Sequence, residues 1–179
     1  MLVVCAIMPN RFGGKEMLEV YVLVEKRKSL VMKLASVLCF VIGASFMALS
    51  LMGALLLFAL AAPLMALGVF LNNRSIEYEY SYFDGDFRFA KIISKQKRKE
   101  LIGYDIENII VIAPKGDRSL HQYLQNPQVK TRDLSSGTQN GKVYGMVAKT
   151  EEGYHLTWFE PDERYLDAVC IKYRQKVIR

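Results

Sequence analysis

The residue types that most often carry catalysis or bind metals are few and widely spaced in this 179-residue chain. The three cysteines form no C-x-x-C pair, and neither His121 nor His155 has a metal-ligand partner at a short spacing. No H-E-x-x-H motif or phosphate-binding loop occurs. The sequence therefore predicts no catalytic residue, no metal site and no cofactor, and indicates a protein that is not an enzyme.

A run of basic residues is the best candidate for a binding site. It comprises Lys91, Lys95, Lys97, Arg98 and Lys99. Beside an anionic lipid leaflet each such charge contributes about 1 kcal/mol, so the run predicts contact with a lipid surface. The alternative is a solvated loop whose lysines protect the edges of neighbouring strands.

A second candidate is the loop segment Arg-Asp-Leu-Ser-Ser-Gly at residues 132–137. Asp133 is expected to cap its own loop through the backbone, and Gly137 is expected to take a positive φ. The functional alternative is contact with a ligand. The net charge of +6 is spread thinly, with 18 basic and 15 acidic residues over positions 74–179, which argues against a nucleic-acid partner.

The elements that would position these residues begin with a long apolar stretch. Residues 30–71 contain one charge, Lys33. A helix that crosses a bilayer needs about 20 apolar residues, so 42 residues predict a transmembrane hairpin over 30–72 with two spans, near 31–49 and 52–71, and a turn around Ser50. A signal peptide has an apolar core of only about 7–15 residues, and a buried hairpin in a soluble core is the other alternative.

The flanks of this stretch predict its orientation. Lys26, Arg27 and Lys28 precede it and Arg74 follows it, whereas the turn carries no charge. Positive residues stay on the cytoplasmic side, so both termini are expected in the cytoplasm of a multi-pass protein of the cell membrane. Small residues recur at four-residue spacing, which favours close helix packing, at Ala44 and Ala48 and again at Ala62 and Ala66.

The rest of the chain has the pattern of a compact β domain, expected over residues 75–179. Alternating residues over 76–83, the Asp84-Gly85 turn signal and a returning strand predict a hairpin. Counting the two strands of this hairpin, the domain is expected to contain about seven strands. An amphipathic helix then begins near Pro161. Residues 1–29 are expected to form a cytoplasmic segment that leads into the membrane. Within it, 1–16 are interpreted as an extension before a start at Met17.

Several stretches, in order, resemble a bacterial family of two-span membrane proteins with a cytosolic pleckstrin-homology-like domain. They are VYVLVEKRK, EYEYSYFDGDFRFAKIISKQKRK, IIVIAPKGD, TRDLSSG and FEPDERYLDAV. The resemblance implies an α+β membrane protein in which a two-helix transmembrane hairpin precedes a seven-stranded barrel or sandwich with a C-terminal capping helix. It implies no activity.

These observations predict a membrane-anchored binding or scaffold module. Its domain would contact a protein partner or the anionic inner leaflet, docking at an exposed strand edge or beside the C-terminal helix. The alternative is an accessory subunit of a larger membrane complex, assembled through the hairpin. The expected partners are the lipid bilayer and either another protein or a second copy of the chain, with no nucleic acid.

Overall fold

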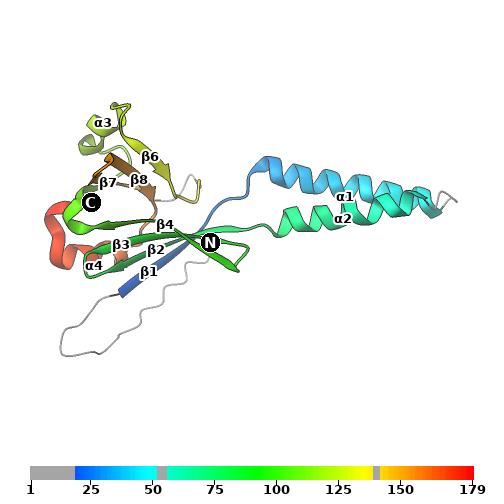
Figure 1. The fold of residues 1–179 in the computed structure, drawn as a ribbon, viewed down its shortest axis with the longest axis horizontal. Coiled ribbons are helices and arrows are strands. Elements are labelled where there is room, and N and C mark those ends of the chain that lie inside the picture. Colours follow the sequence, from blue (N-terminus) through cyan, green and yellow to red (C-terminus); the bar gives the residue numbers. More distant parts are fainter. Residues whose placement is uncertain (1–18, 52–55, 139–141) are drawn as a thin grey trace. The chain divides into compact units, whose positions relative to one another are not determined.

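The structure, a computed structural model, describes residues 19–51, 56–138 and 142–179 (Figure 1). The expectations for residues 1–16 and for a start at Met17 lie outside the described residues. The described chain forms two compact units. One is helical and spans Arg27–Ile76, and the other is mostly β and combines residues 19–26 with Glu77–Arg179.

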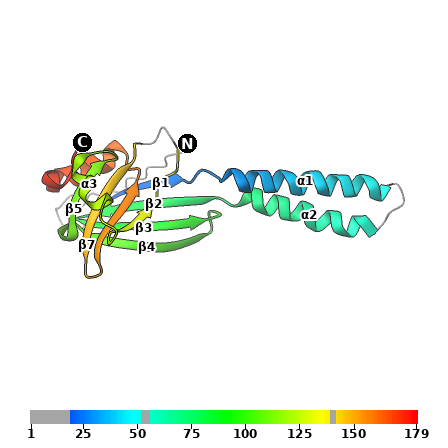
Figure 2. The same ribbon diagram turned by 90° about the horizontal axis from the view of Figure 1, so that it is seen from above.

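Two helices make up the helical unit, α1 (Leu30–Leu51) and α2 (Leu56–Asn73). They lie side by side, and both views show the pair (Figures 1 and 2). Ser36 Oγ donates a hydrogen bond to the carbonyl oxygen of Gly68 over 2.9 Å, whereas Gly43 lies against Met65. Because later residues of α1 meet earlier residues of α2, the helices are antiparallel.

The small residues at the contact between α1 and α2 are not the ones that the sequence predicted. The buried residues are Ser36, Gly43 and Ser50 on α1, and Ala61 and Gly68 on α2. Their spacing is seven residues, which keeps one seam of each helix facing the other. The predicted pairs at four-residue spacing are exposed: Ala44, Ala48, Ala62 and Ala66.

Helix α1 continues through Ser50 to Leu51, so the predicted turn around Ser50 does not begin at Ser50 itself, and residues 52–55 lie outside the described part of the chain. Ser50 Oγ donates to the carbonyl oxygen of Met47 over 2.7 Å, so its hydroxyl is satisfied within the helix and does not end it. Of the helices that the structure describes, α1 alone has the length and apolar composition needed to cross a bilayer. The described apolar part of α2, Leu57–Asn73, is shorter.

Two four-stranded sheets form the β unit within the described residues, so eight strands are present where the sequence predicted about seven in a barrel or sandwich. The first has the order β1 (Glu19–Glu25), β2 (Ile76–Phe83), β3 (Asp86–Ile93) and β4 (Lys97–Asp105). The second has the order β5 (Ile109–Pro114), β7 (Tyr144–Thr150), β8 (Gly153–Phe159) and β6 (Lys130–Asp133). The helices of this unit are α3 (Arg118–Leu124) and α4 (Glu163–Tyr173).

Strand β1 comes from the segment that the sequence assigned to a lead into the membrane. Val20, Val22 and Val24 are buried and pair with Tyr82, Tyr80 and Tyr78 of β2. These valines have the period of two that marks a half-buried strand. The domain therefore extends beyond the expected limits of 75–179 and takes in residues 19–26.

The core between the sheets is aromatic. Tyr80, Phe89 and Phe159 contact one another with their ring centroids 5.6–5.7 Å apart in edge-to-face geometry. Tyr165 of α4 packs on the same cluster, with its centroid 6.0 Å from that of Phe159. Because α4 brings a fully buried ring between the sheets, it is an integral part of the core.

Helix α4 begins at Glu163, two residues after Pro161, the predicted first helical position. Asp162 is the N-cap, and its carboxylate accepts a hydrogen bond from the backbone N–H of Tyr165 over 2.7 Å. A smaller cluster behind the second sheet packs under α3. It comprises Ala113, Leu120, Val129, Val147, Leu156 and Trp158.

Candidate functional site

The predicted basic run lies on the hairpin formed by β3 and β4. Its turn, residues 93–96, is closed by a hydrogen bond from the backbone N–H of Gln96 to the carbonyl oxygen of Ile93 over 3.2 Å. Ser94 and Lys95 occupy the central positions with φ of 52° and 58°. Positive φ at both central positions is the pattern of the tight turns that suit twisted hairpins. Lys95 is therefore held at the tip.

The strand register sorts the other basic residues onto two faces. Lys91 is opposite Lys99, and Lys97 is opposite Ile93, so these side chains share one face. Arg98 is opposite Ile92 and points to the other face. The five residues are thus four lysines at the tip and on one face, and one arginine on the reverse face.

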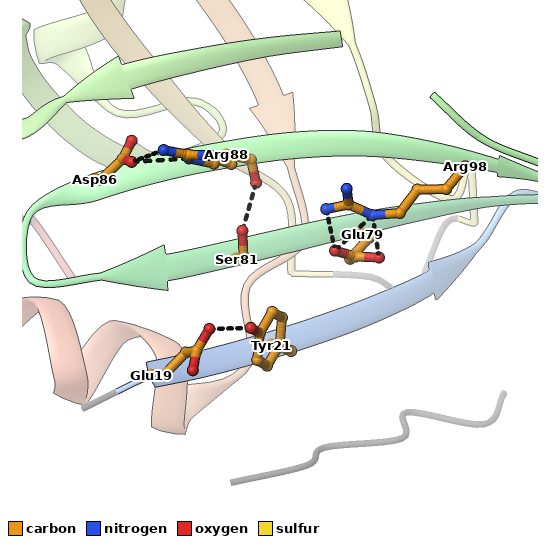
Figure 3. A network of polar contacts seen from close by, with 7 residues as sticks. All are labelled: Glu19, Tyr21, Glu79, Ser81, Asp86, Arg88 and Arg98. Carbon is orange, nitrogen blue, oxygen red and sulfur yellow. Dashed lines mark hydrogen bonds and ion pairs between the residues drawn. The ribbon is translucent and has the colours of Figure 1, made fainter. Parts of the chain in front are cut away.

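Arg98 is neutralised on that reverse face. Its guanidinium donates to Glu79 of β2, with Nη2 2.8 Å from Oε1 and Nε 3.2 Å from Oε2 (Figure 3). This bidentate pair fixes the arginine to the sheet. Within the described part of the chain, Lys91, Lys95, Lys97 and Lys99 have no carboxylate at ion-pair distance. The free positive charge of the run therefore belongs to the lysines.

The same outer face carries further polar contacts. Arg88 pairs with Asp86 over 2.8 Å, and Tyr21 donates to Glu19 (Figure 3). The hydrogen bond to Glu19, together with burial, raises the pKa of Tyr21 to about 12. On this outer face Arg88 and Arg98 are paired with carboxylates, whereas the lysines on the other face are not paired with any in the described residues.

The position of the lysine turn within its sheet follows from strand direction. β1 runs toward the end where Glu25 pairs with Glu77, and β2 starts there. β3 runs antiparallel to β2, so the turn at 93–96 lies at that same end. Lys26 follows β1 there and donates to Tyr78 Oη over 3.3 Å. The lysine turn and the two points where the chain leaves the domain for α1 and α2 therefore occupy one end of the sheet.

The loop at 132–137 is locked from several sides. Asp133 accepts from the backbone N–H of Ser135 over 2.9 Å, as predicted, and Gly137 has a φ of 74°. The carboxylate of Glu160 accepts from the N–H of Ser136 over 3.0 Å, and Tyr80 Oη donates to the carbonyl oxygen of Leu134 over 2.6 Å. Its polar groups are used to hold the loop on the domain, so the structure gives it a structural role.

The two histidines lie apart. His121 is exposed on α3, whereas His155 is buried on β8 beside Tyr104. No group of three or more His, Cys, Asp or Glu side chains able to hold a metal ion occurs among residues 19–51, 56–138 and 142–179. The sequence did not indicate that Glu79 pairs with Arg98, that Glu160 holds the loop at 132–137, or that Lys26 bonds to Tyr78. For Glu79 alone there was a hint, because its place in the alternating strand puts its side chain on the outer face.

Two sheets of strands followed by a helix that packs between them define a PH-like α+β fold. In agreement with this fold, the family model of the bacterial PH-like domain DUF6106 matches residues 18–179, and the chain belongs to this family. PH-like domains are generally binding or scaffold modules without enzymatic activity. Comparisons with curated proteins and with solved structures found no match.

Proposed function

We propose that this protein is a non-enzymatic module in which a helical hairpin spans the membrane twice and holds the PH-like domain against the anionic inner leaflet. The observation that carries the proposal is the place of the free lysines. They lie at the end of the sheet from which both connections to the hairpin leave.

The outer surface of the hairpin supports the two spans. Its exposed side chains are large and apolar, among them Leu34, Leu38, Leu60 and Phe70. Residues 52–71 contain no charged residue and are long enough for a second span of about 20 residues. Water would make this surface costly, at roughly 25 cal/mol for each Å² of apolar area. Lipid chains remove that cost.

The flanking charges support the orientation. Lys26, Arg27 and Lys28 precede α1, and Arg74 follows α2. Both ends of a two-span hairpin lie on one side of the membrane, and positive residues near span ends favour the cytoplasmic side. The domain and the N-terminal segment are then both cytoplasmic.

The connections keep the lysine turn close to the lipid. Four residue steps separate Lys26 from Leu30, and a chain of that length spans at most about 14 Å. Four lysines near an anionic leaflet would contribute about 4 kcal/mol in total. The tether removes most of the entropy cost of association, so this energy is sufficient to orient the domain.

Tags at the two ends test the number of spans. Two spans place an N-terminal and a C-terminal tag on the same side, whereas one span places them on opposite sides. Both tags should be digested by protease in inverted vesicles and protected in right-side-out ones. Protection of one tag in each preparation would disprove the two-span arrangement.

Hydrogen exchange of the full chain in lipid nanodiscs tests the lysine contact. Residues 90–100 should exchange more slowly in discs with anionic lipid than in zwitterionic discs. Changing Lys91, Lys95, Lys97 and Lys99 to Gln should abolish the difference. The matched control changes Lys115, Arg118, Lys142 and Lys149 to Gln and should keep it. Equal exchange in both lipids for the unaltered protein would refute the contact.

Assembly into a larger complex through the hairpin remains the alternative prediction. The small residues of the buried seam already serve the contact between α1 and α2, so they are not free for another helix. A hairpin exchange separates the two hypotheses. If an unrelated two-span hairpin replaces residues 30–73 and co-purifying partners are lost, the alternative is supported.

A further inference from the structure

A buried polar group lies where β4 of the first sheet faces β8 of the second. Tyr104 Oη is 3.3 Å from His155 Nδ1 and 3.2 Å from Thr157 Oγ1. All three side chains are buried, and His155 is only 6% exposed. Since neighbouring core residues are aromatic or aliphatic, this polar group is the exception that needs an explanation.

His155 leaves one ring nitrogen unused. Nε2 is buried and has no hydrogen-bond partner among the residues that the structure describes. Leaving such a group unpaired costs about 1–3 kcal/mol. The neutral ring has one donor and one acceptor nitrogen. If Thr157 donates to Tyr104 Oη and Tyr104 donates to Nδ1, then Nε2 carries the proton and is a donor without an acceptor.

Two cationic residues lie on β6, the strand next to β8. β6 pairs in parallel with β8, with Lys130 beside His155 and Arg132 beside Thr157. Residues paired in this way point to the same face of the sheet. The two cations therefore lie on the face that carries His155, at the outer edge of the second sheet.

The charges at this edge are unevenly paired. Lys130 pairs with Glu152 over 2.6 Å, whereas Arg132 has no carboxylate at ion-pair distance in the described parts of the chain. Burial lowers the pKa of His155, the charges of Lys130 and Arg132 lower it further, and Glu152 opposes them. The field at the imidazole is thus net positive, which is the environment that attracts an anion.

We propose that this edge is a binding site for an oxyanion, a carboxylate or a phosphate group, which accepts from His155 Nε2–H and pairs with Arg132, while Lys130 adds its charge. The site is separate from the lysine turn of β3 and β4, and it does not depend on contact with lipid. Both cations are exposed, whereas His155 Nε2 is buried, so an anion reaches this nitrogen only if side chains at this edge move aside. Tyr104 is the positioning residue, because its hydroxyl holds the ring in the tautomer that donates.

The chain offers a direct measurement, because it has only two histidines. The imidazole nitrogens of His155 and of the exposed His121 can be followed by NMR in the full chain, labelled with ¹⁵N-histidine and kept in detergent. The probes are inorganic phosphate and acetate, with chloride at matched ionic strength as the reference. Concentrations extend to the range that fills a site of millimolar affinity.

Phosphate or acetate should shift the His155 signals in a saturable way and raise the pKa of His155, because a bound anion stabilises the imidazolium. His121 should respond as it does to chloride. A response to phosphate alone assigns a phosphate group, and a response to acetate alone assigns a carboxylate. Arg132→Gln should weaken the apparent affinity at least about tenfold, since it removes a charge-assisted hydrogen bond.

The control Lys149→Gln removes an equal charge from an exposed position of β7 and should leave the affinity unchanged. Unaltered fluorescence of Trp158 would show that each variant is folded. A response of His155 no larger than that to chloride would overturn the proposal. An affinity that survives Arg132→Gln would overturn it as well.

Discussion

Two buried tyrosine hydroxyls in one core should behave in opposite ways when each is removed. Tyr80 and Tyr165 are both fully buried. Tyr80 Oη donates to the carbonyl oxygen of Leu134 over 2.6 Å, whereas Tyr165 Oη has no partner among the described residues. Burial raises the pKa of both hydroxyls above the usual value for tyrosine, so both remain neutral donors at physiological pH.

Replacement by Phe keeps each ring and its contacts, so the hydroxyl is the only group lost. Tyr80→Phe breaks a hydrogen bond and leaves a buried carbonyl without that donor, which should lower the free energy of unfolding by about 1–3 kcal/mol. Tyr165→Phe removes a polar atom that was desolvated without compensation. It should leave the free energy of unfolding unchanged or raise it by up to about 1 kcal/mol.

Urea titration of the full chain in detergent measures the difference, with the fluorescence of Trp158, the single tryptophan, as the signal. Because the slope for a small domain is about 2 kcal/mol per M, a loss of about 1–3 kcal/mol in Tyr80→Phe should lower the midpoint by roughly 0.5–1.5 M. It should also speed the hydrogen exchange of residues 134–138, which the lost bond anchors. Equal destabilisation by the two variants would refute the reasoning, because it would show that Tyr165 Oη has a partner.

Three further predictions concern the helix pair, a cap and pH. Gly43→Leu should destabilise the hairpin by about 1–3 kcal/mol, because a Cβ at this position would lie 2.8 Å from Met65 Cγ. The measurement is a denaturing-detergent titration followed by circular dichroism, and the control Ala44→Leu, at an exposed position, should have little effect. Asp162→Ala should lower the free energy of unfolding of the β unit by about 1 kcal/mol in urea, whereas Asp162→Asn should retain most of it; equal loss would exclude the cap. The pKa of His155 is lowered in the folded state, so the unfolded chain binds more protons and stability should fall as pH decreases below about 6.5. Urea midpoints in phosphate-free buffer should show this slope in the unaltered protein and a smaller slope in His155→Gln.

The sequence predicted the elements whose signals are local. Alternation over 76–83 and the Asp84-Gly85 turn correspond to β2 and the hairpin that follows, and Asp84 and Gly85 both have positive φ. The stripe of apolar residues after Pro161 corresponds to α4. In each case the pattern and the turn chemistry lie within a few neighbouring residues, so a single sequence is sufficient.

Features that depend on distant partners were missed. The valines of β1 alternate correctly, but their partners are residues 78–82, on the far side of the apolar stretch. Nothing in a short window indicates that pairing, so the strand was interpreted as a lead into the membrane. The pairing of Arg98 with Glu79 likewise requires the register across two strands. The basic run could be predicted as a set of charges, but the sorting of its members onto two faces could not.

The pairing of Glu25 with Glu77 has a consequence for synthesis and for engineering. β1 leaves the ribosome first but finds its partner only after the whole apolar hairpin has been made, so the domain completes its fold late. The same pairing places Glu25 and Glu77 side by side, where the helical unit interrupts the domain. A tight Asn-Gly link between Glu25 and Glu77 could therefore replace the intervening helices, and the shortened chain is expected to form an ordinary four-stranded meander without them.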